Sequence, residues 1–312
     1  MSLKPLLSKN RGMPTLSLKG GVGVFLFFVL LHLGSALPTT AQDLSNRSER
    51  MVGLGEVVIA DAPLPDKVFQ AQKHKIIVQV TLIDRKDPSF RQVSMGTGTI
   101  IGAGTILTNR HVWDGAKPAM AGREYVSEFS GLILAENHIA EFPLRLVGVG
   151  EVGTFRDFMV LQTGPEIMQR AVPPNTPTEP NPYWILRNNE MGLVNKVKVG
   201  ERVYLTGYSP VFSKINNADG LVFEAYIDFI NYTFPAEVVA KIEEMPMNKM
   251  GRVKRLYRLK DGAEPGFSGG MCFNEKGHLV GITVLLSPAQ NFVYVLSAED
   301  IRDFLRANKV NF

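Results

Sequence analysis

The chain has 312 residues, of which 45% are hydrophobic and 21% are charged. This is an ordinary globular composition, and the length suffices for one large or two small cores. The formal net charge is +4, but residues 1–41 contain four basic residues and no acidic one, which leaves 30 basic against 30 acidic residues in the rest. The charge balance gives no ground for a nucleic-acid partner, and we expect none.

Residues 1–41 have the pattern of an export signal. A basic segment precedes an apolar run over residues 22–33, and small residues follow at Gly34-Ser35-Ala36 and Thr39-Thr40-Ala41. The run is shorter than the roughly 20 apolar residues that a bilayer-spanning helix needs, which favours a cleaved signal peptide over an uncleaved membrane anchor. We expect a periplasmic or secreted bacterial protein, which would contact the membrane only if this segment is retained.

The single cysteine, Cys272, excludes an intrachain disulfide. It follows Ser268 by four residues within an apolar run. We therefore interpret it as a small buried hydrophobic side chain and not as a reactive thiol. Export without disulfides fits a bacterial protein better than an animal extracellular one.

Short β-rich runs with glycine-containing turns follow in chain order. Residues 42–75 are polar and contain proline, and we interpret them as an N-terminal arm. Strands are predicted over residues 76–83, 98–101, 105–108, 132–134, 144–149 and 158–162, and the turn at 102–104 makes a hairpin of its two flanking strands. Many short strands of this kind are typical of a β-barrel or sandwich. We assign residues 76–164 to an N-terminal β-barrel.

A proline-rich stretch over residues 172–182 indicates a linker or insertion, to which we assign residues 165–195. Strands are predicted beyond it over residues 202–207, 221–230, 279–286 and 291–296, and a short helix over residues 235–243. Ser297 as N-cap, with Asp300 three residues later, predicts a final helix whose apolar stripe is Ile301, Phe304 and Leu305. We assign residues 196–312 to a C-terminal β-barrel that ends in this helix.

Three residues able to carry chemistry occur in the order His111, Asp157 and Ser268. His111 follows the predicted hairpin, Asp157 opens a hydrophobic strand, and Ser268 lies in the motif Gly266-Phe267-Ser268-Gly269-Gly270. This is one of the chain orders in which a histidine and a carboxylate activate a serine. Each residue alone is better explained as a structural one, but the ordered set favours the functional interpretation.

A serine hydroxyl is a weak nucleophile at neutral pH and needs a base and an orienting carboxylate. We expect Ser268 to attack, His111 to act as the base, and Asp157 to orient the histidine. The developing oxyanion needs hydrogen-bond donors, for which we expect the backbone N–H groups of Gly266 and Ser268. Glycine at position 266 allows the unusual turn that this arrangement requires.

The Gly-x-Ser-x-Gly pattern also matches the nucleophile elbow of α/β-hydrolases, but in that fold the acid and the histidine follow the serine. Only His278 follows Ser268, in a predicted turn, and the long alternation of strands and helices is missing. No His-x-x-x-His or His-Glu-x-x-His spacing occurs, so we expect neither a metal nor another cofactor.

Three segments resemble the trypsin-like serine peptidases, most closely the bacterial branch that includes the high-temperature-requirement proteases. They are residues 97–112 around His111, residues 157–161 from Asp157, and residues 261–282 around Ser268. The resemblance implies an all-β, chymotrypsin-like fold of two six-stranded antiparallel β-barrels with a C-terminal helix and the site between the barrels. It also implies a serine endopeptidase that cleaves protein or peptide substrates through an acyl-enzyme, and the pattern of residues 1–41 adds the expectation that this enzyme is exported.

By alignment to that family, the primary substrate pocket is lined by Gly262, Val284 and Leu286, and none of them is charged. The resemblance therefore implies a small or apolar preferred side chain in the substrate. We expect no peptide-binding domain after the final helix.

The chain departs from the family at Phe267, where Asp or Asn is usual, and in insertions around residues 165–195 and 210–255. Phe267 keeps open the alternative of a catalytically silent trypsin-like fold that acts as a protein-binding module. We expect Phe267 instead to hold the serine segment by packing its ring into the second barrel.

Overall fold

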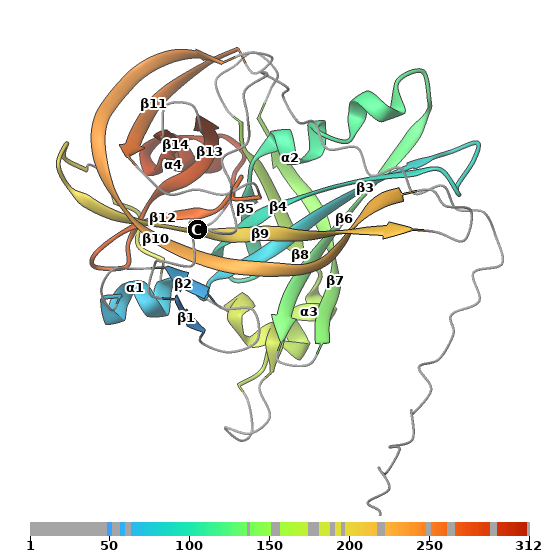
Figure 1. Ribbon diagram of the computed structural model, residues 1–312, viewed down its shortest axis with the longest axis horizontal. Helices are drawn as coiled ribbons and strands as arrows, with labels where there is room; N and C mark the ends of the chain where they lie inside the picture. Colours follow the sequence, from blue (N-terminus) through green and yellow to red (C-terminus); the bar gives the residue numbers. More distant parts are fainter. Residues whose placement is uncertain are drawn as a thin grey trace, which may run out of the picture.

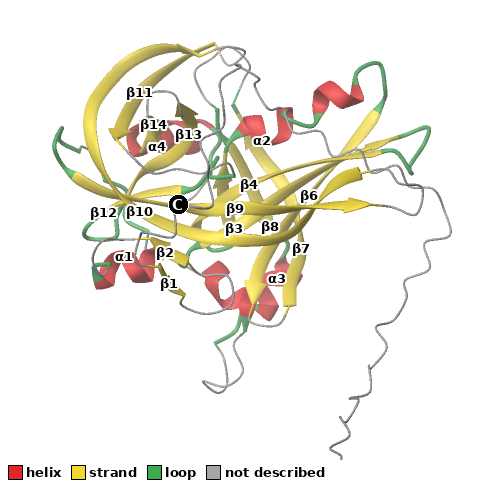
Figure 2. Ribbon diagram, viewed as in Figure 1, coloured by secondary structure: helices red, strands yellow, loops and turns green. Residues whose placement is uncertain are grey.

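The computed structural model describes residues 49–51, 57–59, 64–135, 138–150, 157–173, 181–187, 191–194, 197–216, 222–247, 251–260, 266–287 and 292–310 (Figure 1). In this part of the chain, strands form two closed antiparallel barrels of six strands each, with short helices around them (Figure 2). The two-barrel, all-β fold implied by the resemblance is confirmed. None of the helices described is long and apolar enough to cross a membrane.

The first barrel consists of β3 (Lys75–Asp84), β4 (Arg91–Gly102), β5 (Thr105–Thr108), β6 (Tyr125–Ala135), β7 (His138–Val149) and β8 (Met159–Thr163). The strands close in the order β3-β4-β5-β8-β7-β6. β4 and β5 form the predicted hairpin, and Gly104 at its turn has a φ of 67°, which glycine adopts without strain. The interior is apolar and includes Ile76, Val78, Val80, Leu82, Ile100, Ile106, Met159 and Leu161.

The second barrel consists of β9 (Arg202–Asn216), β10 (Val222–Met247), β11 (Gly251–Lys260), β12 (Met271–Asn274), β13 (Leu279–Ser287) and β14 (Phe292–Ser297). These strands close in the order β10-β11-β14-β13-β12-β9. The strand interiors bury a second set of apolar side chains, among them Val203, Leu205, Val238, Leu259, Cys272, Val280, Val293 and Val295. Cys272 is thus a buried hydrophobic side chain as predicted, and burial raises the pKa of its thiol.

Short elements flank the barrels. In the predicted arm lie the paired strands β1 (Glu49–Met51) and β2 (Val57–Ile59) and the helix α1 (Asp66–Ala71). In the predicted linker lie α3 (Pro165–Arg170) and the 3₁₀ helix η3 (Pro182–Arg187), whose Ile167 and Leu186 are buried in the core of the first barrel. These two helices of the linker therefore pack onto the first barrel, whereas residues 192–194 pair with Leu279 of the second barrel. The domain boundaries themselves stay a prediction.

The predicted helix over residues 235–243 is wrong. These residues belong to β10, which pairs with β9 at Pro235 and with β11 at Glu237. Ala236 and Val238 are buried whereas Glu237 between them is exposed, which is the two-residue alternation of a strand. Pairing on both sides overrides the local helix signal that Pro235 provides.

The predicted insertion around residues 210–255 is built largely from long strands. β9 and β10 extend beyond the second barrel and run along the first (Figure 1). Phe229 of β10 is buried against Ile77 of β3 and Leu132 of β6, and Tyr208 of β9 packs on the same cluster. The extended β9–β10 hairpin therefore ties the two barrels together near the serine segment.

The final helix, α4 (Ala298–Ala307), confirms the predicted cap and stripe. The Ser297 hydroxyl oxygen accepts a hydrogen bond from the backbone N–H of Asp300 at 3.2 Å, which satisfies a free donor of the first turn. Phe304 is buried, with its ring centroid 5.2 Å from that of Phe158. Because Phe158 directly follows Asp157 in the chain, the last helix braces the segment that carries this aspartate.

Candidate active site

The first barrel places His111 and Asp157 side by side. The helix α2 (Arg110–Asp114), which carries His111, begins just after β5, and Asp157 lies just before β8. Since β5 and β8 are neighbouring antiparallel strands, the end of one meets the start of the other. The side-chain amide of Asn109 and the backbone N–H of Arg110 donate hydrogen bonds to the carbonyl oxygen of Asp157, at 3.0 and 3.3 Å, and fix the two segments together.

His111 contacts both of the other predicted residues. Its Nδ1 lies 2.5 Å from Oδ2 of Asp157, and its Nε2 lies 2.6 Å from Oγ of Ser268. The backbone N–H of His111 also donates to Oδ1 of Asp157 at 2.8 Å, so both carboxylate oxygens accept a hydrogen bond. A carboxylate can only accept, so we assign the imidazole proton to Nδ1, which leaves the lone pair of Nε2 for the Ser268 hydroxyl.

The surroundings of His111 favour its charged form. Burial lowers the pKa of His111, but the charge and the hydrogen bond of Asp157, together with the charge of Asp114, outweigh it and raise the pKa above the ordinary value of 6.5. The Asp157 side chain is only 2% exposed and that of His111 is 30% exposed. The carboxylate is therefore shielded from water, while the imidazole remains accessible at the surface of the site.

Ser268 lies in residues 266–270, which we call the serine loop. Gly266 and Gly269 have φ values of 95° and 83°, which side chains with a Cβ rarely adopt. A Cβ on Gly266 would lie 2.5 Å from the carbonyl oxygen of Tyr208, so glycine is needed at that position for space as well. The expected need for glycine at position 266 is confirmed.

Phe267 anchors the serine loop in the second barrel, as predicted. Its side chain is 1% exposed and belongs to the apolar core of that barrel. Its ring centroid lies 5.8 Å from that of Phe234 and 6.4 Å from that of Tyr232. An aromatic contact thus holds the loop at the position where the related peptidases usually have a polar residue.

Comparison with known protein families shows which family this chain belongs to. A model of the trypsin-like peptidase domain matches residues 96–282, which is more than half of the chain. The chain belongs to the trypsin-like peptidase family. It is therefore assigned to the serine peptidases, and the matched residues include His111, Asp157 and Ser268.

Several solved structures are similar to this peptidase at low sequence identity. The active form of the Rv3671c protease from M. tuberculosis is 16% identical, with 82% of this chain and 90% of that chain covered and a TM-score of 0.47. Its inactive form is also 16% identical, with coverage of 80% and 98% and a TM-score of 0.45. Deg5 is 16% identical, with coverage of 76% and 90% and a TM-score of 0.46. No curated protein matches the peptidase significantly.

Of the three residues predicted to line the primary substrate pocket, the structure describes only Val284 in full. Val284 is 3% exposed and packs in an apolar cluster with Ile282 and Leu296. Gly262 and the side chain of Leu286 lie outside the described residues. The pocket formed by these three residues stays a prediction.

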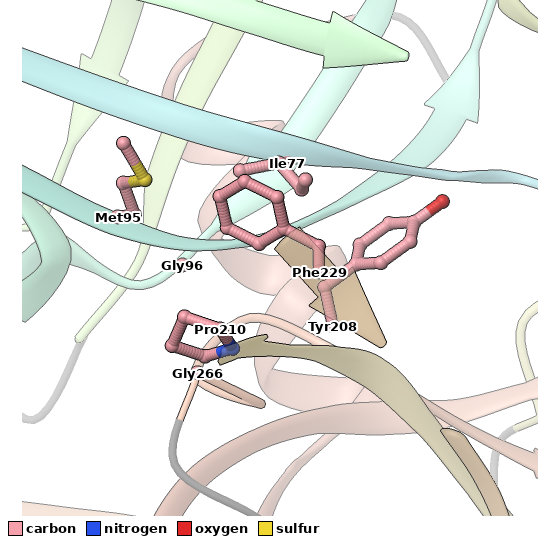
Figure 3. Close-up of a pocket in the computed structure, with 7 residues that line it drawn as sticks. All are labelled: Ile77, Met95, Gly96, Tyr208, Pro210, Phe229 and Gly266. Carbon is pink, nitrogen blue, oxygen red and sulfur yellow. The ribbon is translucent and has the colours of Figure 1, made fainter. Parts of the chain in front are cut away.

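An apolar pocket that the sequence did not indicate adjoins the serine loop of the peptidase (Figure 3). A Cβ on Gly96 would lie 3.0 Å from the carbonyl oxygen of Ser268, so one wall of the pocket lies against the backbone of the serine loop. Its residues come from segments far apart in the chain and share no motif. They are Ile77, Met95, Gly96, Tyr208, Pro210, Phe229 and Gly266.

We expect peptide hydrolysis by the peptidase to depend on pH through His111. The base must be neutral to accept a proton, and Asp157 and Asp114 raise its pKa above 6.5. The value of kcat/KM should therefore rise with pH through an apparent pKa above 6.5 and then level off. Folding favours the protonated imidazole, so its contribution to the free energy of unfolding is present below 6.5 and is lost as pH rises through the raised pKa.

The profile is measured as kcat/KM between about pH 5 and about pH 8, the range in which histidine titrates. Asp114→Asn provides an internal check, because it removes one of the charges that raise the pKa of His111. The apparent pKa of this variant should lie below that of the wild type. A flat profile with chemistry limiting the rate would contradict His111 as the base.

Proposed function

We propose that this protein is an exported serine endopeptidase that hydrolyses internal peptide bonds of proteins or peptides with His111, Asp157 and Ser268. The observation that carries the proposal is the unbroken contact from the Asp157 carboxylate through the His111 ring to the Ser268 hydroxyl, at 2.5 and 2.6 Å. These distances lie within hydrogen-bond reach, which a nucleophile and its base require.

In the proposed reaction, Oγ of Ser268 forms a bond to the carbonyl carbon of the substrate while its proton moves to Nε2 of His111. Asp157 stabilises the resulting imidazolium, and the backbone N–H groups of Gly266 and Ser268 donate to the oxyanion. The C–N bond then breaks and the proton passes from His111 to the leaving amine, which yields an acyl-enzyme. Water attacks the ester in the second half, His111 takes a proton from the water and returns it to Ser268, and the acid product leaves.

The alternative of a catalytically silent binding module gains no support from the site. Phe267 motivated that alternative, but its ring lies in the core of the second barrel, away from the contact between His111 and Ser268. The hydrogen-bond contacts among the three side chains support the enzyme rather than the silent module.

A substrate preference for a small or apolar side chain rests on the expected primary pocket of Gly262, Val284 and Leu286, none of which is charged. Export to the periplasm or the medium rests on the pattern of residues 1–41, which lie outside the described part. If the segment is cleaved as proposed, the exported protein should begin near Leu37 or Gln42.

The proposal is tested by exposing the exported protein to a mixed library of peptides and identifying the new termini by mass spectrometry. An endopeptidase produces cuts within peptides, with apolar residues enriched beside the cleaved bond. Ser268→Ala protein serves as the matched control and should produce none of these cuts. Trimming only from peptide ends, or no cleavage in a folded wild-type protein, would overturn the assignment.

A further inference from the structure

Thr97 of β4 lies where the serine loop meets the first barrel. β4 pairs with β3 at this residue, but its pairing with β5 begins only at Thr99. The open edge beside Thr97 is taken by the serine loop, since the backbone N–H of Thr97 donates to the carbonyl oxygen of Ser268 at 2.9 Å. The nucleophile of the second barrel is thus attached to a strand of the first.

The hydroxyl of Thr97 makes two further hydrogen bonds in a site with no exposure to water. It lies 2.9 Å from the backbone nitrogen of Tyr208 and 2.9 Å from the carbonyl oxygen of Gly266. A backbone N–H can only donate, so the hydroxyl accepts from Tyr208 and uses its single proton for Gly266. One side chain therefore connects β4, β9 and the serine loop.

These bonds hold the carbonyl groups of the serine loop in place. Thr97 binds the carbonyl oxygens of Gly266 and Ser268, and the oxygen of Phe267 between them accepts from the N–H of Gly270 at 2.6 Å. Three successive carbonyls are thus fixed.

Of these three residues, Gly266 most needs a hydrogen bond from outside the serine loop, because it has no Cβ and its backbone rotates at little cost. A carbonyl oxygen that turned toward the oxyanion position would repel the negative charge that develops on the substrate oxygen. The hydroxyl proton of Thr97 gives the Gly266 oxygen a partner on the side of the first barrel.

We propose that Thr97 is a positioning residue for peptide hydrolysis, whose hydroxyl fixes the Gly266 carbonyl and so the course of the backbone between the N–H groups of Gly266 and Ser268, the two expected oxyanion donors. This inference rests on the proposed function. Thr97 touches neither the substrate nor the proton-transfer chain. It acts on the electrostatics of the site through the conformation of Gly266.

The test compares Thr97→Val, which keeps the shape and removes the hydroxyl, with Thr97→Ser, which keeps the hydroxyl. We expect Thr97→Val to lower kcat by about 10- to 100-fold, somewhat less than removal of a direct oxyanion donor. KM and the apparent pKa of the pH profile should stay near the wild-type values, since His111 is not disturbed. Thr97→Ser should remain within about threefold of the wild type; an equal loss in both variants would overturn the proposal.

Thr206→Val is the matched control for stability. The hydroxyl of Thr206 is also buried, donates to the carbonyl oxygen of Tyr232, and lies 2.9 Å from the hydroxyl oxygen of Thr233. It contacts no atom of the serine loop through these bonds. We expect this variant to lower the unfolding temperature by an amount similar to Thr97→Val, with kcat unchanged. Equal loss of kcat in both variants would reduce Thr97 to a structural role and contradict the proposal.

The rate of labelling by a fluorophosphonate gives a readout that requires no knowledge of the substrate. In this reaction Oγ of Ser268 bonds to phosphorus, fluoride leaves, and the serine proton passes to His111. A wild-type protein that is not labelled would refute the proposed function itself. A wild type that is labelled, with folded Thr97→Val labelled at the same rate, would refute only the role of Thr97.

A third variant covers the case in which Thr97→Val does not fold. Thr97→Cys keeps a side chain of similar size with a weaker donor, and its labelling rate should lie below that of the wild type. A folded Thr97→Cys protein that is labelled at the wild-type rate, with wild-type kcat, would overturn the proposal.

Discussion

Replacing Ser268 or His111 by alanine should lower kcat for peptide hydrolysis by roughly a millionfold, and replacing both should be scarcely worse than replacing either one. The two side chains act as a unit, because the hydroxyl attacks only as its proton moves across the 2.6 Å contact to Nε2. Once either partner is missing, the other contributes little to the rate.

The measurement is kcat on a peptide that the wild-type protein cleaves, for both single variants and the double variant. His278→Ala is a suitable control, because His278 is an exposed histidine in the turn after β12. It should retain wild-type kcat. Wild-type activity in Ser268→Ala would refute the triad. So would a loss of kcat in the double variant that approaches the product of the two single losses.

Asp157→Asn should lower kcat by about 10⁴-fold while leaving the fold intact. Both carboxylate oxygens accept a bond from His111, one from the ring and one from the backbone N–H. An asparagine has one oxygen and one NH₂ group, so one of these donors loses its acceptor. If the NH₂ group faces Nδ1, the imidazole proton moves to Nε2, and the ring can no longer accept the proton of Ser268.

Asp114→Asn is the matched control for this charge change. Asp114 lies in the same helix as His111, but its carboxylate binds Arg110 and Lys117 rather than the imidazole ring. At pH values above the apparent pKa of the profile, the kcat of Asp114→Asn should stay within about threefold of the wild-type value. Surface ion pairs that do not contact reacting atoms usually have effects of this size. An equal loss of kcat in Asp114→Asn and Asp157→Asn would show that loss of negative charge near the site, and not orientation of the ring, explains the effect.

The sequence predicted those parts of the site that depend on short local segments. The hairpin before His111 and the cap of α4 were predicted from neighbouring residues, because turn chemistry and capping act over three or four positions. The proximity of His111, Asp157 and Ser268 was inferred from their order in the chain and the glycine-rich serine motif, and the resemblance to a known family supported it. The sequence alone contains no measure of their separation in space.

The parts that were missed depend on contacts between distant segments. Residues 235–243 form a strand because β9 and β11 pair with them on both sides, a contact that no local pattern reveals. Thr97 reaches Gly266 across 169 positions, and its hydroxyl carries no signal in a strand that is rich in threonine and glycine. The apolar pocket likewise combines Ile77, Phe229 and Gly266, which only the closed barrels bring together.

The central claim is that Ser268 is an activated nucleophile, and site-mapped labelling of the full chain with a fluorophosphonate tests it most directly. Intact and peptide mass spectrometry should find one adduct, on Ser268, in the wild type. The adduct should be absent from Ser268→Ala and should form far more slowly in Asp157→Asn. A folded wild-type protein that remains unlabelled, or an adduct that persists on another residue in Ser268→Ala, would contradict the claim.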